Sequence, residues 1–396
     1  MNLEQALPKE WANILLGDIA NFSQGIQIGT EEHISELKNG YQRFIRIIDY
    51  TQPSNTDIRY VPLQSERYYA KIDDIVMIRY GTPGIIGRGI EGIIANNMFK
   101  ITFDKIVLND FAEQYFKFPE TLKKITDGSA SSTMPAINFG FLKKLPFILP
   151  PLSEQQKIAE ILSTVDNKIE VIYQQITETK ELKKGLMQRL LTKGIGHTEF
   201  KDSPLGRIPK SWEVVKQSDV ATFYNGRAYK LSEWEKEGIP VIRLQNLTGT
   251  GKNYYYSNLN LPEHQYCHKG DLLYMWSATF GPVWWFGEKA IFHYHIWKIE
   301  HNAQLLDKIF HYYLLDNVTT RMKNESHGST MLHVTKGGME KLLIQLPPLK
   351  EQQMIADILG SVDEKLEVLS KKKTRYKELK LGLMQQLLTG KIRVKV

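Results

Sequence analysis

The sequence predicts an α+β protein in which two pseudo-symmetric α/β domains are joined by two long helices that form an antiparallel intramolecular coiled coil. Three observations lead to this fold class. A large unit of the 396-residue chain occurs twice, each copy starts with short β-like runs, and each copy ends in a long stretch with helical periodicity. With 42% hydrophobic and 24% charged residues, the composition is that of a folded globular protein.

The duplication sets the domain organisation. The segment Pro150-Pro151-Leu152-Ser153-Glu154-Gln155-Gln156 returns 197 residues later as Pro347-Pro348-Leu349-Lys350-Glu351-Gln352-Gln353, and 27 of the 43 positions in 150–192 are identical to 347–389. The start of the unit, Leu7 to Trp11, is echoed by Ile208 to Trp212. We therefore expect a first domain at 1–151, a first helix at 152–194, a linker and second domain at 195–347, and a second helix with a basic tail at 348–396.

The repeated tails have the periodicity of a coiled coil. Apolar residues alternate steps of four and three in both tails. They are Ile158, Leu162, Val165, Ile169, Ile172 and Ile176 in the first, and Ile355, Leu359, Val362, Leu366 and Leu369 in the second. Residues 153–190 form a helix of about 57 Å at 1.5 Å per residue. A partner of matching length lies in the same chain, so we expect the two helices to pair with each other; the alternative is a coiled coil between two chains.

Helix direction decides where the domains lie. Antiparallel pairing puts the two domains at opposite ends, related by a pseudo-twofold axis, whereas parallel pairing would put them together.

Each domain has three clear runs of β-branched and aromatic residues followed by a helical pattern. The expected strands are Arg43–Ile48, Asp74–Tyr80, Met98–Phe103, Pro240–Leu244, Asp271–Trp276 and Ala290–Ile299, and the expected helices are 108–125 and 305–322.

Composition and charge exclude several functions. The net charge of +7 lies mainly in residues 348–396, with 11 basic against 6 acidic side chains, and it suits a polyanionic partner without identifying one. The single cysteine, Cys267, can form neither an internal disulfide nor a thiolate metal cluster. No apolar run is long enough to cross a bilayer and no signal peptide is visible, so we expect a cytoplasmic protein. Motifs for amino-group methylation, nucleotide binding, zinc proteolysis and serine hydrolysis are absent, and we expect no catalytic centre and no metal.

In the first domain, the glycine-rich loop from Arg79 to Gly89 is the best candidate for a DNA contact. Arginine pairs with guanine, and glycine permits close backbone approach. The alternative is a turn whose arginines face solvent. The candidate DNA-binding residues of this domain are Arg43, Arg46, Arg79, Tyr80, Arg88, Asn97 and Thr133.

The second domain differs in composition, since its half of the chain holds nine of ten histidines and six of seven tryptophans. Arg243 to Asn246 ends an expected strand with groups that can bond base edges; a turn could equally use these groups. His293 and His295 should share one face of a strand, where a DNA-facing or structural role is favoured over a metal pair. The candidates here are Arg243, Gln245, Asn246, Trp276, Ser277, Thr279, His293, His295, Thr330 and His333.

Over essentially its whole length the sequence resembles the specificity subunit of type I restriction–modification enzymes. The resemblance rests on the Leu-Pro-Pro-Leu and Glu-Gln-Gln motifs at 149–156 and 346–353, and on the Leu-Met-Gln-x-Leu-Leu-Thr helix ends at 186–192 and 383–389. The linker residues His197, Phe200, Gly206, Pro209 and Trp212 also look like those of this family.

The resemblance implies that each domain is a target-recognition domain reading one half of a split, asymmetric site in double-stranded DNA. It further implies that the helices space the domains and dock two methyltransferase (modification) subunits. Restriction subunits would then bind to this complex. S-adenosylmethionine, ATP and Mg²⁺ would then act only in those partners, and this chain would carry no cofactor and no catalytic residue. From the residues alone two other functions stay open. One is a scaffold whose two heads bind proteins, with DNA binding incidental; the other is a nucleic-acid binder of no fixed sequence.

Overall fold

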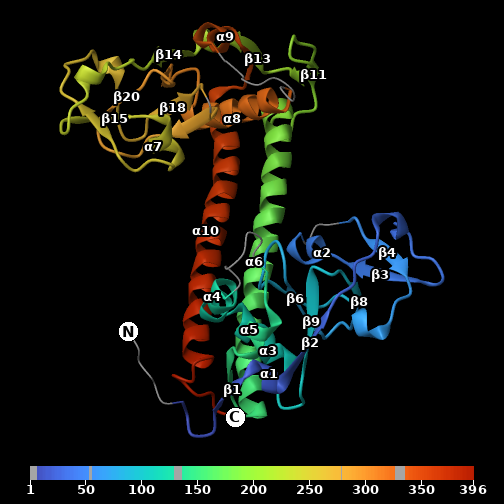
Figure 1. Ribbon diagram of the computed structural model, residues 1–396. Coiled ribbons are helices and arrows are strands. Elements are labelled where there is room, and N and C mark those ends of the chain that lie inside the picture. Colours follow the sequence, from blue (N-terminus) through green and yellow to red (C-terminus); the bar gives the residue numbers. More distant parts are fainter. Residues whose placement is uncertain (1–6, 53–55, 129–135, 278, 326–334) are drawn as a thin grey trace. The chain divides into compact units, whose positions relative to one another are not determined.

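The computed structural model describes residues 7–52, 56–128, 136–277, 279–325 and 335–396. The chain divides into two compact units (Figure 1). Unit 1 comprises Met1–Tyr173 and Lys371–Val396, and unit 2 comprises Gln174–Ser370. Each unit thus contains one globular head together with one end of each long helix.

The head of unit 1 contains two four-stranded sheets within the described residues. One is antiparallel with the order β2-β9-β6-β7, and the other has the order β4-β3-β8-β5 with β3 and β8 parallel. The strands are β1 (Ala12–Leu15), β2 (Ala20–Gln24), β3 (Tyr41–Ile45), β4 (Arg59–Pro62), β5 (Tyr69–Ala70), β6 (Ile75–Ile78), β7 (Ile86–Gly87), β8 (Gly92–Ile94), β9 (Met98–Phe103) and β10 (Pro146–Leu149). The helices are α1 (Leu16–Ile19), α2 (Ile47–Thr51), α3 (Asn109–Lys117), α4 (Pro119–Asp127) and α5 (Phe139–Lys143), with 3₁₀ turns at Thr30–Glu32 and Glu66–Tyr68.

The head of unit 2 repeats this topology. Its sheets have the orders β14-β21-β18-β19 and β16-β15-β20-β17, again with one parallel pair, β15 and β20. The strands are β11 (Phe200–Lys201), β12 (Ile208–Pro209), β13 (Glu213–Lys216), β14 (Ala221–Asn225), β15 (Ile239–Ile242), β16 (Tyr255–Ser257), β17 (Tyr266–Cys267), β18 (Leu272–Met275), β19 (Gly281–Trp284), β20 (Ala290–Phe292), β21 (Ile296–His301) and β22 (Leu343–Leu346). The helices are α7 (Leu244–Thr248), α8 (Lys308–Glu325) and α9 (Lys336–Lys341), with 3₁₀ turns at Gln217–Asp219, Leu231–Glu233 and Glu263–Gln265.

The structure has a strand at each of the six places where the sequence predicts one, and β9 has the predicted bounds. Two predictions need correction. Residues 290–299 form two strands, β20 and β21, because the chain turns between them at Tyr294 and His295. The predicted helix at 108–125 is two helices, because Pro119 has no N–H to donate and holds Phe118 in an extended conformation.

The two long helices, α6 (Leu152–Lys193) and α10 (Leu349–Leu387), pack antiparallel in each unit, which confirms the predicted pairing. In unit 1 the ammonium group of Lys380 lies 2.6 Å from a carboxylate oxygen of Asp166. In unit 2 Lys183 lies 2.6 Å from Asp363. Moving 17 residues forward along α6 therefore moves 17 residues back along α10. The apolar seam between the helices is buried. Four of its residues have no solvent-exposed surface: Ile158, Leu162, Ile355 and Leu359.

The repeated Glu-Gln pair of the tails attaches each head to its helix. In unit 1 Trp11 donates its indole N–H to Glu154, and the backbone N–H of Leu108 donates to Gln155 over 2.8 Å. The amide of Gln155 in turn donates to the carbonyl groups of Ile106 and Pro150. Both side chains are fully buried, so their hydrogen bonds replace lost water. The motif is therefore a structural attachment.

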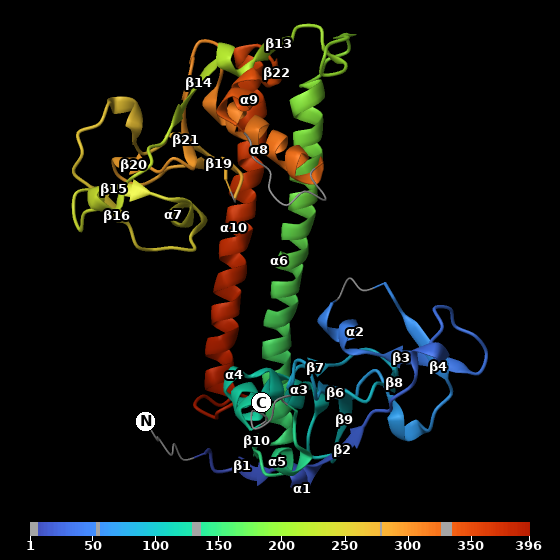
Figure 2. The ribbon, with the colours of Figure 1, turned by 45° about the horizontal axis from the view of Figure 1, so that its top comes forward.

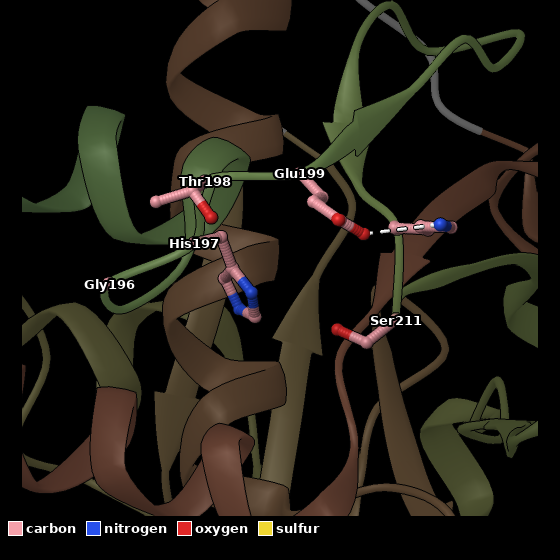
Figure 3. Close-up of a pocket in the computed structure, with 6 residues that line it drawn as sticks. Gly196, His197, Thr198, Glu199 and Ser211 are labelled. Atoms are coloured by element: carbon pink, nitrogen blue, oxygen red, sulfur yellow. Dashed lines mark hydrogen bonds and ion pairs between the residues drawn. The ribbon is translucent and has the colours of Figure 1, made fainter.

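The same attachment recurs in unit 2. Trp212 donates to Glu351 over 2.9 Å, and the backbone N–H of Asp307 donates to Gln352 over 2.8 Å. Glu351 also accepts from the backbone N–H of Ile195 at 3.0 Å and contacts His197 at 2.8 Å. A hollow of about 460 Å³ lies beside this group, lined by His197 and Ser211 and by the ion pair of Glu199 with Lys210. Figure 3 shows the side chains that line it.

In unit 1 the chain after α10 takes the place that the linker after α6 takes in unit 2. The guanidinium group of Arg393 lies 2.5 Å from Glu154 and 2.5 Å from Glu10. Each long helix therefore ends in a segment that binds the glutamate at the start of the other helix.

Candidate nucleic-acid interface

Three segments meet at one end of the β15-β20 sheet in unit 2, and we call this group the strand-end cluster of unit 2. They are the end of β15, the turn between β20 and β21, and the segment after β18. The backbone N–H of His293 donates to the carbonyl of Ile242 at 2.9 Å, and that of Trp276 donates to His295 at 3.2 Å. Figure 2 shows β15, β16, β20 and α7 in this part of the unit.

The strand-end cluster of unit 1 is built in the same way. The backbone N–H of Ala95 donates to Ile45 at 3.0 Å, and that of Arg79 donates to Asn97 at 2.8 Å. The end of β3, the turn between β8 and β9, and the segment after β6 therefore meet. The two heads share the backbone frame of the cluster and differ in the side chains on it.

In each head a glycine lets two backbone segments of the cluster come close together. A Cβ atom on Gly25 would lie 2.2 Å from the carbonyl oxygen of Ala95, and one on Gly226 would lie 2.2 Å from that of His293. Real Cβ atoms do not approach a carbonyl so closely, so these two positions require glycine. Both heads therefore have a glycine directly after β2 or β14, where the backbone approaches this turn closely.

The unit 2 cluster lines a hollow of about 480 Å³. Its residues are Trp234, Arg243, Leu244, Gln245, Tyr255, Ser277, His293 and His295. Five of the predicted DNA-binding residues are thus brought together: Arg243, Gln245, Ser277, His293 and His295. The guanidinium group of Arg243 lies 4.3 Å from the ring centre of Tyr255, which in turn packs on Trp234 at 4.5 Å. Gln245 is exposed at the edge of the hollow.

The two histidines of this hollow are close together and electrically neutral at pH 7. Their ring centres are 5.2 Å apart. Burial, with smaller contributions from the charges of His295 and Arg243, lowers the pKa of His293 to about 4, and burial also lowers the pKa of His295. A neutral imidazole has one donor and one acceptor, which suits a base edge better than a phosphate group.

Two local predictions for this region are wrong. His293 and His295 do not share a face of one strand; they flank the turn at Tyr294, which is closed by a hydrogen bond from Ile296 N–H to His293 at 2.9 Å. Arg243 does not continue β15, but precedes the first turn of α7. The turn is favoured because Asn246 accepts the backbone N–H of Arg243 at 2.9 Å.

In the unit 1 cluster, Arg79 holds the backbone together. Its Nε donates to the carbonyl of Ile137 at 3.0 Å and its Nη1 donates to Gln24 at 2.6 Å, while the guanidinium group stacks on Phe139 at 4.9 Å. Tyr80 is half-buried beside it. The side-chain oxygen of Asn97 is buried and has no hydrogen-bond partner among the described residues.

The other candidate arginines of unit 1 take part in ion pairs. Arg46 precedes α2 as Arg243 precedes α7, and it lies 3.1 Å from Asp57, while Arg43 lies 3.8 Å from Asp49. Both side chains remain partly exposed, 22% for Arg46 and 33% for Arg43.

The structure does not bring every candidate to a cluster. Arg88 contacts Asp73, Asp110 and Glu113, which places it toward the start of β6, whereas Arg79 follows its end. The side-chain amide of Asn246 is used within its turn, since it also donates to the carbonyl groups of Gly251 and Asn253. Trp276 donates to the carbonyl of Tyr294 at 2.7 Å, and Thr279 is exposed between β18 and β19. Thr133, Thr330 and His333 lie outside the described residues.

Sequence reasoning missed three residues of the clusters, Gln24, Trp234 and Tyr255. Tyr255 is the middle residue of the triplet 254–256, and three consecutive aromatic residues in a strand put at least one on each face, which is a signal that could have identified it. Trp234 and Gln24 carry no such signal, because their positions depend on contacts distant in the sequence.

The comparison with known proteins agrees with this duplicated architecture. A family model described as the type I restriction modification DNA specificity domain matches residues 8–181 and again residues 209–378. The chain belongs to this family. A type I restriction enzyme MjaVIII specificity subunit from Methanocaldococcus jannaschii is 29% identical over 412 residues, which cover 98% of this chain and 94% of the relative. A putative MjaX specificity subunit from the same organism is 33% identical over 347 residues, 86% of this chain and 79% of the relative.

Solved structures have the same fold as this specificity subunit. The S subunit of a type I restriction–modification system from M. genitalium aligns with a TM-score of 0.57 at 14% identity, covering 98% of both chains. A chain from a structure concerned with complex assembly and conformational transition of a type I system aligns at 0.59 and 17% identity, covering 98% of this chain and 99% of the other. Among the described residues, no helix is long and apolar enough to span a membrane.

Proposed function

We propose that this specificity subunit reads a split, asymmetric site in double-stranded DNA, one half with each head. The observation that carries the proposal is the strand-end cluster, which occurs in both heads on one backbone frame with different side chains. A shared frame holds both heads against the duplex in the same manner, while different side chains select different bases. The two half-sites should therefore differ in sequence.

In unit 2 the proposed base-reading residues are Arg243, Gln245, His293 and His295. Arginine donates two hydrogen bonds to the O6 and N7 atoms of guanine, and glutamine pairs in the same bidentate way with adenine. Tyr255 keeps the guanidinium group of Arg243 in place by stacking. A neutral histidine pair adds a donor and an acceptor without attracting phosphate groups.

In unit 1 we assign base reading to Asn97 and Tyr80, with Arg43 and Arg46 beside them. The side-chain oxygen of Asn97 has no hydrogen-bond partner in the part of the chain that the structure describes. Asn97 occupies the position of His295 in unit 2, because its backbone carbonyl accepts from Arg79 after β6, as that of His295 accepts from Trp276 after β18. We give Arg79 a positioning role, because two of its nitrogen atoms are already bonded within the head.

We further propose that α6 and α10 set the distance between the half-sites and dock two methyltransferase subunits. Two pairs of exposed apolar residues support docking, because they occur at matching positions in both helices. Val171 and Val368 are 52% and 63% exposed, and Leu182 and Leu379 are 52% and 50% exposed. The exposed half of each side chain contributes nothing to the pairing of the two helices, and a partner that covers it would be stabilised by its burial. The same residues at both sites favour two copies of one partner.

Catalysis in this proposal belongs to the partners. The methyltransferase subunits would bind S-adenosylmethionine, and restriction subunits would use ATP and Mg²⁺, while this chain would supply the DNA sequence preference alone, in the cytoplasm. The second candidate, a protein-binding scaffold, is favoured by the same exposed apolar pairs but leaves the two different clusters without a function.

Exchange of one head tests the proposal. Residues 1–150 are replaced by the corresponding head of another specificity subunit, and methylated adenines are mapped genome-wide in cells that contain the partner subunits. We expect one half of the target to change and the other to stay. A change in both halves contradicts modular reading, and an assembled complex without any sequence preference supports the scaffold.

A further inference from the structure

Each long helix has an outward-facing stripe of four residues, and the two stripes differ in charge. The α6 stripe is Val171, Gln175, Glu178 and Leu182, and the α10 stripe is its match 197 residues later, Val368, Lys372, Arg375 and Leu379. Steps of four, three and four residues put the members of a stripe on one face of their helix. All eight side chains are exposed.

The ends of the stripes are identical, whereas their centres are not. Seven of the eight positions in 172–179 differ from those in 369–376, although the tails as a whole are mostly identical. Between its apolar ends, α6 has one lysine and two glutamates, and α10 has four lysines, one arginine and one glutamate. At the stripe centres, Gln175 and Glu178 carry one negative charge in total, and Lys372 and Arg375 carry two positive charges. Lys372 and Arg375 form no ion pair with the described residues.

Packing within the chain does not require the difference at the stripe centres. The neighbouring seam residues Ile172 and Leu369 are buried and remain apolar in both helices. One charged residue between the apolar ends, Lys373, takes the seam position of Ile176, and its ammonium group lies 4.9 Å from the ring centre of Tyr173 on α6. The charges at the stripe centres lie on exposed side chains that point away from the seam, so they change what a partner meets.

We propose that the two stripes are unequal docking sites, so that two copies of the methyltransferase subunit bind this chain with different affinities. The inference rests on the docking proposed above and adds an order of assembly to it. Two identical partners present the same surface to both stripes, and one surface cannot complement a negative centre and a positive centre equally well. We expect dissociation constants about tenfold apart at low ionic strength, becoming nearly equal when the charges are screened.

A titration measures the two affinities. The full chain is titrated with the purified methyltransferase subunit of the same system at about 50 mM and about 500 mM salt, and native mass spectrometry counts bound copies. We expect a complex with one copy to accumulate before the complex with two at low salt, and much less of it at high salt. Equal, independent sites at low salt would overturn the inference.

Two charge exchanges identify the stripes as the cause. Q175K/E178R gives the α6 stripe the centre of the α10 stripe, and K372Q/R375E does the reverse. Either variant should bring the two dissociation constants within about threefold of each other. The control K184E changes the charge by two units on another face of α6, and should leave the gap unchanged. A gap that persists in both exchange variants contradicts the inference.

The outcome is separable from that of the docking proposal. V171D/L182D and V368D/L379D should each lose one of the two copies. If both variants still bind two copies as the unmodified chain does, docking on the stripes is wrong altogether. If K372Q/R375E lowers the affinity of the chain for DNA and leaves partner binding unchanged, the positive stripe contacts phosphate groups and the inference is wrong.

Discussion

The indole N–H of Trp212 donates to the carboxylate of Glu351 over 2.9 Å, although the two residues are 139 positions apart. Its counterpart, Trp11 with Glu154, joins residues 143 positions apart in the other unit. The tryptophan that opens each repeat is therefore bonded to the helix that closes it, which explains why both ends of the repeat are retained while the residues between them diverge.

Glu351→Ala should destabilise unit 2 by about 1–3 kcal/mol, because it leaves the N–H groups of Trp212 and Ile195 buried without an acceptor. Thermal unfolding followed by tryptophan fluorescence measures the change. Lys350→Ala is the matched control, since this neighbouring side chain is exposed and should change the unfolding temperature little. Equal effects of the two variants would show that the carboxylate does not hold the head.

The paired helices can be tested with a charge exchange. Asp166→Lys should cost about 1 kcal/mol, since it brings two positive side chains together where Asp166 now contacts Lys380. Lys380→Asp in the same chain should recover most of that loss in a double-mutant cycle of urea unfolding. The equivalent cycle on Lys183 and Asp363 serves as an internal replicate, and additive effects in both cycles would contradict the observed register.

The repeat made the fold predictable from the sequence, because the seam of Ile158, Leu162, Ile355 and Leu359 shows the helical period twice. The strand-end clusters were only partly predictable. Arg243 and His293 were found from their side-chain chemistry, but their meeting depends on hydrogen bonds between segments about 50 residues apart. Arg88 shows the opposite failure, since nothing in its loop indicates the three carboxylates that surround it.

Unit 2 should lose stability in acid because of two buried histidines. The imidazole ring of His311 is hydrogen-bonded on both sides. Its Nδ1 lies 3.0 Å from Nε2 of His301, and its Nε2 lies 2.8 Å from the side-chain oxygen of Gln217. Burial lowers the pKa of His301 to about 4 and the pKa of His311 well below its usual value. Both rings are neutral in the folded state and protonate near pH 6.5 when unfolded. The stability is therefore complete above pH 6.5 and is lost as the pH falls toward 4, by about 3 kcal/mol for His301.

Tryptophan fluorescence reports this transition selectively, because six of the seven tryptophans lie in unit 2. His301→Phe introduces the residue found in unit 1, where Phe103 pairs with Ala20 as His301 pairs with Ala221. This variant should have a shallower dependence of unfolding free energy on pH between 6.5 and 4. An unchanged slope would assign the acid sensitivity to other groups.

Spacer length should follow helix length. Deletion of 168–174 together with 372–378 removes one heptad from each helix and preserves both the Asp166–Lys380 and the Lys183–Asp363 pairs. Each helix becomes about 10 Å shorter, which corresponds to about three base pairs. The deletion also removes Val171, Lys372 and Arg375 of the proposed docking stripes, so the test measures binding of the chain to duplexes of different spacer length and not methylation. We expect tightest binding to a target with a shorter spacer, with the base preferences of both halves retained. A folded variant that binds the original target as tightly as the unmodified chain does would show that the helices do not set the spacing.

The last prediction concerns base reading by Arg243. Arg243→Ala should weaken binding to the true target by about 1–3 kcal/mol and relax discrimination at one position of one half-site, because a bidentate contact to guanine is lost. A phosphate contact would instead weaken binding to all duplexes alike and reduce the salt slope by about one unit. Binding isotherms of the assembled complex at two salt concentrations, on the target and on single-base variants, distinguish these outcomes.

Two further variants test whether the cluster as a whole reads bases. Gln245→Ala should relax discrimination at a position adjacent to that of Arg243→Ala, since both residues line the same hollow. Arg88→Ala is the matched control in the other head. Its guanidinium group bonds carboxylates toward the opposite end of β6, so it should lower the unfolding temperature without changing any base preference. If Arg88→Ala relaxes discrimination while Arg243→Ala and Gln245→Ala leave it intact, the reading surface lies elsewhere in both heads and the strand-end clusters are structural.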